Sequence, residues 1–170
     1  QATPMLVVMM DGNVSSGNFG EQSLQTFENE LMKVVIPFIQ KNYRTRETGQ
    51  QRALAGLSMG GLQTLYAGIN NTDQFAYLGV FSSGWFGGTQ TAAEKQYAFM
   101  QQSTGKINSN LKQFWIAMGG KEDIAYKNCQ NMLARFDEMK IKYSYSEYPG
   151  GHTWPVWRNN LYQFAQLLFK

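Results

Sequence analysis

The order of apolar segments along the chain constrains its fold more than any other feature of the sequence. Short apolar runs of a length typical of buried strands occupy residues 5–10, 52–57, 77–81 and 114–118, and an alternating stretch occupies 142–148. Between them, apolar residues recur at helical spacing over 27–39, 61–69, 92–102, 126–140 and 158–169. Strands that alternate with helices predict a mostly parallel sheet covered by helices on both faces, which is an α/β fold.

The composition is that of one folded domain. Hydrophobic residues make up 43% of the 170 residues and charged residues only 16%, which excludes a disordered chain. The formal net charge is +3, but Lys and Arg are scattered along the chain, so nucleic acid is not an expected partner. The longest apolar run, 5–10, is too short to cross a bilayer, so no membrane partner is expected either. We predict a single domain over residues 1–170.

The chain contains one cysteine, Cys129, and one histidine, His152. A single cysteine cannot form an intrachain disulfide, and its helical surroundings favour a structural thiol. One cysteine and one histidine cannot supply an ordinary zinc site. The glycine-rich stretch 12–20 lacks the spacing of a phosphate-binding loop. We therefore expect neither a metal nor another cofactor.

The sequence Gly56-Leu-Ser-Met-Gly60 matches the G-x-S-x-G pattern, in which a serine occupies a strained turn between a strand and a helix. Here the pattern lies between the strand-like run 52–57 and the helical segment 61–69, which is the context that the motif requires. The turn lifts the hydroxyl off the sheet, and the N-terminus of the next helix points at developing negative charge. We predict Ser58 as a nucleophile and the Met59 backbone N–H as a donor to the oxyanion.

His152 is the predicted general base. Hydrolases with this turn carry the serine, then the acid, then the histidine along the chain, and His152 follows the last predicted strand. The acid is expected after a strand between them, where Glu122 and Asp123 both follow the run 114–118. We prefer Asp123, because the shorter aspartate takes this role more often. Its task would be to fix the imidazole tautomer and to stabilise the imidazolium.

Several segments of the chain resemble the esterase D-like α/β-hydrolases, most of all the bacterial feruloyl and acetyl-xylan esterases of carbohydrate esterase family 1. The similar segments are 4–12, 27–31, 36–39, 52–61, 119–123 and 150–158. The resemblance implies an α/β-hydrolase fold and a catalytic triad of Ser58, Asp123 and His152. It also implies hydroxycinnamoyl or acetyl esters on plant cell-wall polysaccharide as substrates, and a secreted or periplasmic enzyme.

Three aromatic residues lie on loops at the predicted catalytic edge of the sheet. Trp85 and Phe86 follow the strand 77–81, and Trp154 follows His152. In open α/β sheets, ligands bind at this edge. If the resemblance holds, these rings are candidates to stack on an aromatic acyl group or a sugar, although ordinary loop packing explains each of them equally well.

The chain differs from these esterases at its front. Family members have strands before the run 5–10 and a His-Gly-type loop that provides a second oxyanion donor, whereas this sequence begins at Gln1. It resembles the last two-thirds of a family domain, without the N-terminal strands. We expect a companion N-terminal segment, or self-association, to cover the sheet edge that would otherwise be open.

Two other functions are compatible with the sequence. The first keeps the hydrolase chemistry but changes the substrate to S-formylglutathione or a siderophore ester. The second is a non-catalytic carbohydrate-binding remnant of the fold that uses Trp85 and Trp154 as a stacking platform. The intact order of serine, acid and histidine favours an enzyme, because a binding module does not need it.

Overall fold

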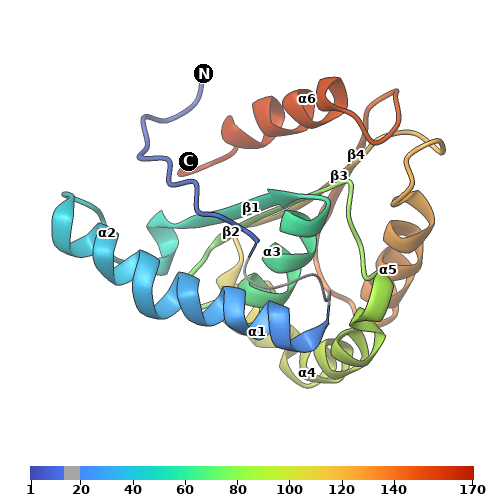
Figure 1. Ribbon diagram of the computed structural model, residues 1–170, viewed down its shortest axis with the longest axis horizontal. Helices are drawn as coiled ribbons and strands as arrows, with labels where there is room; N and C mark the ends of the chain where they lie inside the picture. Colours follow the sequence, from blue (N-terminus) through green and yellow to red (C-terminus); the bar gives the residue numbers. More distant parts are fainter. Residues whose placement is uncertain (14–19) are drawn as a thin grey trace.

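The computed structural model describes residues 1–13 and 20–170, and its centre is a parallel sheet (Figure 1). Four strands lie in the order β1-β2-β3-β4, and every neighbouring pair is parallel. The strands are β1 (Ala53–Leu57), β2 (Tyr77–Phe81), β3 (Gln113–Met118) and β4 (Ser144–Glu147). The predicted α/β class with a parallel sheet is therefore confirmed.

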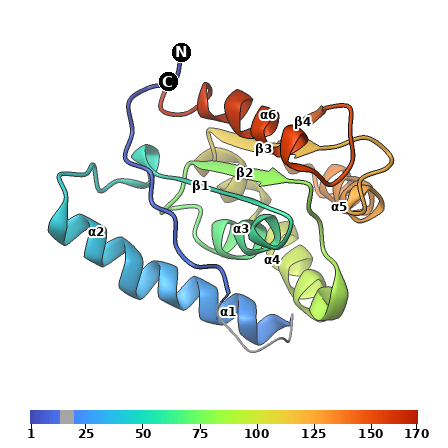
Figure 2. The same cartoon turned by 45° about the horizontal axis from the view of Figure 1, so that its top comes forward.

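Helices cover both faces of this sheet (Figure 2). They are α1 (Glu21–Glu30), α2 (Ile36–Asn42), α3 (Met59–Asn70), α4 (Gln90–Asn110), α5 (Tyr126–Glu138) and α6 (Trp154–Ala165). A π-helical turn, Leu31–Val35, joins α1 to α2, and 3₁₀ turns occupy Gly49–Gln51 and Gly87–Thr89. Helix α6 packs on one face, and α3, α4 and α5 contribute to the core on the other. No helix in the described ranges is long and apolar enough to span a membrane.

Strand β2 lies in the middle of the core. All five of its residues are buried, as expected for a strand of a parallel sheet with both faces covered. Leu78 and Val80 belong to the larger core on the α3 side, whereas Tyr77 and Phe81 pack with Phe164 of α6. Gly79 lets α6 approach, because a Cβ atom there would lie 2.8 Å from the Phe164 ring.

The prediction of a strand over residues 5–10 is wrong. The segment has neither helical nor strand structure, and Val7 and Met9 are 71% and 92% exposed. A strand needs a neighbour that accepts and donates its backbone hydrogen bonds, and the sheet of the described residues ends at β1. Apolar character indicated that this run requires burial, but it could not provide the neighbouring strand.

Several helix boundaries also differ from the prediction, among them the start of α6 and the end of α4. Helix α6 begins at Trp154 rather than at 158, and Pro155 fits because the first helical turn does not need its missing N–H. Helix α4 extends to Asn110, beyond the predicted end at 102. The earlier start places the first turn of α6 next to His152, with only Thr153 between them.

Candidate active site

Ser58 occupies a strained turn between the end of β1 and the start of α3. Its backbone has φ 51° and ψ −116°, a region that residues with a Cβ rarely adopt. The turn is tight: a Cβ atom on Gly56 would overlap the backbone of Gly60, and one on Gly61 would lie 2.5 Å from the Cβ of Ser83. At Gly60, such a Cβ would meet no atom of another segment of the described structure within 4 Å. The close packing of this turn therefore requires glycine at positions 56 and 61. At position 60 a Cβ atom would meet no steric obstacle of this kind in the described part of the chain.

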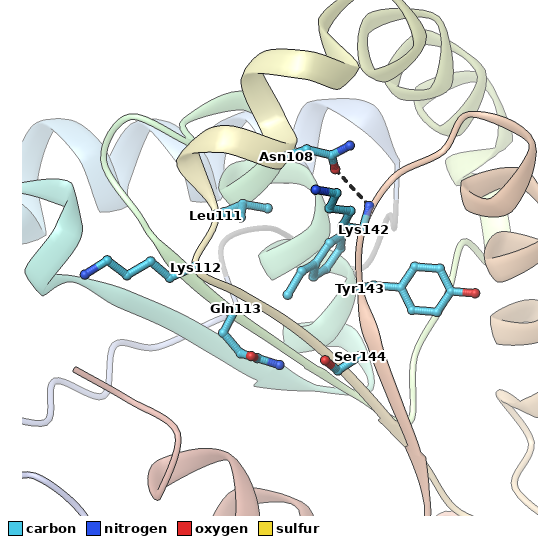
Figure 3. A pocket seen from close by; sticks show the side chains of 8 residues that line it. Asn108, Leu111, Lys112, Gln113, Lys142, Tyr143 and Ser144 are labelled. Carbon is cyan, nitrogen blue, oxygen red and sulfur yellow. Dashed lines mark hydrogen bonds between the residues drawn. The ribbon is translucent and has the colours of Figure 1, made fainter. Parts of the chain in front are cut away.

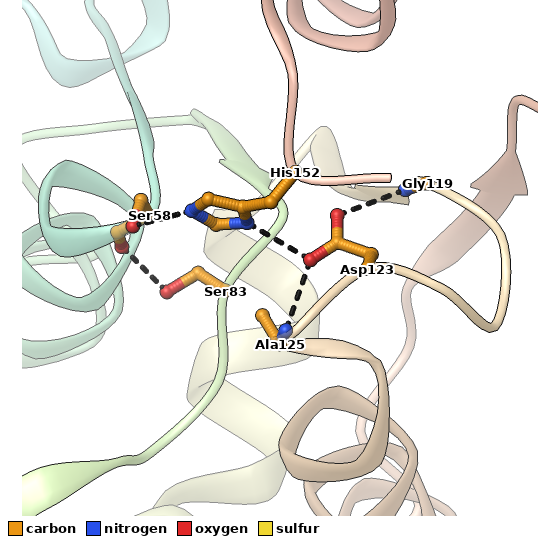
Figure 4. Close-up of polar contacts among 6 residues, drawn as sticks. All are labelled: Ser58, Ser83, Gly119, Asp123, Ala125 and His152. Carbon is orange, nitrogen blue, oxygen red and sulfur yellow. Dashed lines mark hydrogen bonds and ion pairs between the residues drawn. The ribbon is translucent and has the colours of Figure 1, made fainter. Parts of the chain in front are cut away.

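His152 connects Ser58 to Asp123 (Figure 4). Its Nε2 atom lies 2.9 Å from the Ser58 Oγ, and its Nδ1 atom lies 2.9 Å from an Asp123 Oδ1. Because an ionised carboxylate only accepts hydrogen bonds, the Nδ1–H donates to Asp123 and Nε2 is free to accept from the hydroxyl. The three residues come from three loops at the carboxyl ends of β1, β3 and β4, which is the edge expected for ligands in such a sheet.

Asp123 is held as an ionised acceptor. Its side chain is fully buried, and it accepts hydrogen bonds from the backbone N–H groups of Ala125 at 2.9 Å and, more weakly, Gly119 at 3.4 Å. Burial disfavours the charged form, but the hydrogen bonds from Ala125 and His152, together with the Ser82 hydroxyl, outweigh burial and lower the pKa of Asp123. Glu122, the other candidate acid, is exposed. The geometry therefore brings Asp123, and not Glu122, to the histidine.

Met59 is the first residue of α3. The N–H groups in the first turn of a helix have no acceptor within that helix, and the helix dipole makes this end attractive to negative charge. The predicted oxyanion donor is thus placed directly after the predicted nucleophile. Cys129 does not compete as a nucleophile, because it is buried and burial raises the pKa of its thiol to about 12.

The three predicted aromatic contacts differ in their exposure. Trp85 is half-buried and packs edge-on against Tyr97, with ring centroids 6.4 Å apart. Phe86 is also half-buried and packs on the small cluster that includes Leu62. Trp154 is 61% exposed and free to meet a ligand. Packing against neighbouring side chains therefore explains why Trp85 and Phe86 are present, whereas most of the Trp154 side chain remains exposed.

Two residues that contact the candidate site, Trp157 and Ser83, were not predicted from the sequence. Trp157 packs its ring edge-on against His152, at a centroid distance of 4.9 Å, and meets Trp154 on its other side at 5.2 Å. Ser83 donates a hydrogen bond of 2.7 Å to the Ser58 carbonyl (Figure 4). The i, i+3 spacing of the two tryptophans after the histidine was the available signal for Trp157, provided that the helix had been predicted to begin at Trp154.

A separate hollow lies at the opposite end of the sheet (Figure 3). It has a volume of about 160 Å³ and is lined by residues before and at the starts of β3 and β4, among them Asn108, Lys112 and Lys142. Ser58, His152 and Asp123 lie beyond the carboxyl ends of the strands, so this hollow is not part of their site. Among the described residues, no group of three His, Cys, Asp or Glu side chains could hold a metal ion.

The amino-acid sequence matches known esterases over nearly its whole length. The model of the Esterase family, described as "Putative esterase", matches residues 3–167. An endo-1,4-beta-xylanase/feruloyl esterase of Xylanibacter ruminicola is 29% identical over 170 residues, which is 98% of this chain and 21% of that protein. An iron(III) enterobactin esterase of Escherichia coli is 24% identical over 132 residues, 78% of this chain and 31% of that protein.

Solved structures share the fold. The feruloyl esterase module from Clostridium thermocellum, complexed with sinapinate, has a TM-score of 0.70 and 26% sequence identity, over 86% of this chain and 59% of that one. An S-formylglutathione hydrolase from Staphylococcus aureus has a TM-score of 0.66 at 15% identity, over 85% of this chain and 65% of that one, and so supports the fold alone. This chain thus spans under two-thirds of these structures and about a fifth of the xylanase/feruloyl esterase. The chain belongs to the Esterase family and has an α/β-hydrolase-type fold.

Proposed function

We propose that this protein is a serine carboxylic-ester hydrolase in which Ser58, His152 and Asp123 form the catalytic triad. The observation that carries the proposal is the continuous hydrogen-bonded chain from the Ser58 hydroxyl through both ring nitrogens of His152 to a buried carboxylate. A structural serine or histidine has no need of this order. The strained backbone of Ser58 supports the same role, because such strain persists where the surroundings hold it for function.

The geometry supports the following steps for the proposed reaction. The Ser58 Oγ attacks the ester carbonyl carbon while His152 Nε2 takes the hydroxyl proton. The carbonyl oxygen becomes an oxyanion near the Met59 N–H at the start of α3, and Asp123 stabilises the imidazolium. His152 then gives its proton to the departing alcohol oxygen, which leaves an acyl group on Ser58. A water molecule, deprotonated by His152, repeats the attack and releases the carboxylic acid and free Ser58.

We place the substrate among feruloyl or acetyl esters of plant cell-wall polysaccharide, and the enzyme outside the cytoplasm, secreted or periplasmic. Two relatives support this choice: the xylanase/feruloyl esterase at 29% identity and the feruloyl esterase module at 26%, the latter in complex with a hydroxycinnamate. The exposed Trp154 ring next to the His152 loop would stack on the acyl group or a sugar, with smaller contributions from Trp85 and Phe86. Aromatic faces suit both kinds of ligand.

The enterobactin esterase relative and the S-formylglutathione hydrolase fold support a second candidate substrate, a siderophore ester or a glutathione thioester. Both keep the same triad. Methyl ferulate, p-nitrophenyl acetate and S-formylglutathione therefore form an informative substrate panel. A ferulate preference supports the polysaccharide ester, and a thioester preference would replace it.

The open edge of the sheet is part of the proposal. In the described part of the chain, β1 pairs only with β2, and the exposed apolar residues Leu6, Val7 and Met9 precede it in the sequence. An unpaired edge of this kind invites another strand. We expect a companion segment or a second copy of the chain to pair there. Sedimentation velocity and slow amide exchange over β1 would report such pairing, whereas a monomer with fast exchange at β1 would count against it.

The decisive experiment compares the wild type with Ser58→Ala on p-nitrophenyl acetate and methyl ferulate. Loss of the nucleophile is expected to reduce kcat on the order of 10⁴-fold or more. Ser109→Ala is the matched control, because this exposed serine lies near the end of α4 and should leave activity unchanged. Equal hydrolysis by the wild type and Ser58→Ala, in a folded protein, would overturn the serine mechanism and favour the carbohydrate-binding remnant.

A further inference from the structure

Two consecutive serines follow β2, and neither is in the predicted triad. Ser82 and Ser83 are both 0% exposed. Ser82 has a positive φ of 44°, which residues with a Cβ seldom adopt. A strained backbone that carries two buried hydroxyls requires an explanation, because packing alone would accept glycine or alanine at such positions.

Ser83 is fixed to the turn that carries the nucleophile. Its hydroxyl donates to the Ser58 carbonyl at 2.7 Å (Figure 4). The N–H of Ser58 donates to the carbonyl of Phe81, at the end of β2, at 2.8 Å. Both the N–H and the C=O of the nucleophile are therefore held by the same short segment. The close packing against Gly61 leaves the Ser83 side chain little freedom to move away.

Ser82 is fixed to the part of the chain that carries the acid. Its N–H donates to the carbonyl of Ala117 in β3 at 2.8 Å, and Asp123 lies on the loop after β3. Ser82 comes one residue after the paired Phe81 and Ala117, so it lies at the end of β3 where the Gly119 N–H reaches the Asp123 carboxylate. The Ser82 hydroxyl is buried with no hydrogen-bond partner among the described residues, and it contributes to the lowered pKa of Asp123. Among the described residues, one oxygen of that carboxylate accepts only the long 3.4 Å bond from Gly119, so it has capacity for another donor.

We propose that Ser82 and Ser83 are positioning residues, whose adjacent hydroxyls hold Asp123 and the Ser58 turn at a fixed separation so that His152 can bridge them. The inference rests on the proposed serine mechanism. The positive φ of Ser82 is the means by which consecutive side chains reach these two targets. Hydrogen bonds in unliganded sites are often poorly aligned and tighten during the reaction. The Ser82 hydroxyl is therefore expected to align with Asp123 when the imidazolium forms.

Kinetics of Ser82→Ala and Ser83→Ala test this role, with Ser109→Ala as the control. We expect each of the two variants to lower kcat about 10- to 100-fold with KM changed by less than about twofold, since alignment and not substrate binding is lost. In Ser82→Ala the acidic limb of the kcat/KM profile should also move to higher pH, because a carboxylate with one donor fewer is protonated more readily. Ser83→Ala should leave that limb in place. Unchanged kcat in both folded variants would overturn the proposal.

Ser82→Gly separates the hydroxyl from the backbone. Glycine relieves the strain at positive φ but lacks the hydroxyl, so activity should remain low even though the protein folds at least as well as the wild type. Full activity in Ser82→Gly would show that Ser82 has only a backbone role, and would contradict the proposed hydrogen bond. This variant also keeps the test valid if Ser82→Ala fails to fold.

Nuclear magnetic resonance provides a readout that does not depend on activity. His152 is the only histidine, so protein labelled with ¹⁵N-histidine reports this ring alone. Removal of the Ser82 hydroxyl should shift the Nδ1–H signal of the His152–Asp123 hydrogen bond, whereas Ser109→Ala should not. If Ser82→Ala shifts the signal but the wild type has no esterase activity, the proposed function is refuted and the positioning role of Ser82 is kept. If Ser82→Ala leaves the signal unshifted and the wild type is active, only the positioning role of Ser82 is refuted.

Discussion

Two similarly apolar runs, one in the centre of the sheet and one near the front of the chain, differ in whether they are buried. Around β2 an apolar run is buried on both faces, and the loops that follow the strands converge on Ser58, His152 and Asp123. At residues 5–10 an equally apolar run lies outside the sheet, and its residues 6–9 are exposed. The difference is the presence of neighbours: a strand is stable where others satisfy its backbone and cover its faces. The candidate active site lies where both conditions are met.

The largest effect is expected at the triad acid. Asp123→Asn should lower kcat about 10⁴-fold, because an amide no longer selects the productive histidine tautomer. Glu122→Gln removes a neighbouring but exposed carboxylate and should change kcat by less than about twofold. Steady-state hydrolysis of p-nitrophenyl acetate measures both. Equal losses in the two variants would contradict the assignment of the acid.

The two glycines around Ser58 test how tightly the turn is packed. Gly56→Ala should lower the free energy of unfolding by about 2–3 kcal/mol and impair activity, because its Cβ overlaps the Gly60 backbone. Gly60→Ala faces open space and should change stability by less than about 1 kcal/mol. Urea unfolding compares them. A Gly60→Ala variant as unstable as Gly56→Ala would show that the turn is packed differently.

Two valines compare the core with the front of the chain directly. Val80 is 0% exposed and Val7 is 71% exposed. Val80→Ala should therefore cost about 2 kcal/mol of unfolding free energy, from lost burial and the cavity left behind. Val7→Ala should stay within about 0.5 kcal/mol. If Val7→Ala costs as much as Val80→Ala in denaturant unfolding, the front segment is buried in solution, by a companion strand or by a second copy.

The smallest effect concerns pH. Because the pKa of Asp123 is lower in the folded state than its ordinary value of 3.8, the stability that its charge contributes is complete above that value. It is lost as the pH falls through the lower folded pKa. Urea midpoints of the wild type and Asp123→Asn should therefore approach each other when the pH drops from 5 to below about 3. A gap that widens over this range would contradict a depressed pKa.

Much of the fold was predictable from the sequence because the apolar patterns of most segments match the burial that those segments have in the fold. The strand Tyr77–Phe81 was predicted with its observed bounds, and the start of α5 at Tyr126 was also predicted. The segment 5–10 was not, since apolar character reports a need for burial and not the presence of a neighbour. The start of α6 at Trp154 was missed because the apolar repeat alone cannot define a first turn that contains Pro155.

Residues of the candidate site were predictable only where a sequence motif or a residue type that occurs once identifies them. Ser58 lies in a recognisable turn motif, and His152 is the only histidine, so few alternatives existed. Asp123 and Glu122 could not be separated by spacing, because burial decides between them. Ser83 and Trp157 were missed because their roles depend on contacts across the fold or on side-chain orientation. No local pattern encodes such contacts.

Covalent trapping tests directly whether Ser58 is an activated nucleophile. The wild type is incubated with a fluorophosphonate, which reacts with activated serines, and the modified peptide is identified by mass spectrometry. One adduct is expected, on Ser58, and it should be lost in Ser58→Ala and form much more slowly in Asp123→Asn. An adduct on another serine, or none in a folded protein, would contradict the assignment of Ser58, His152 and Asp123 as a catalytic unit.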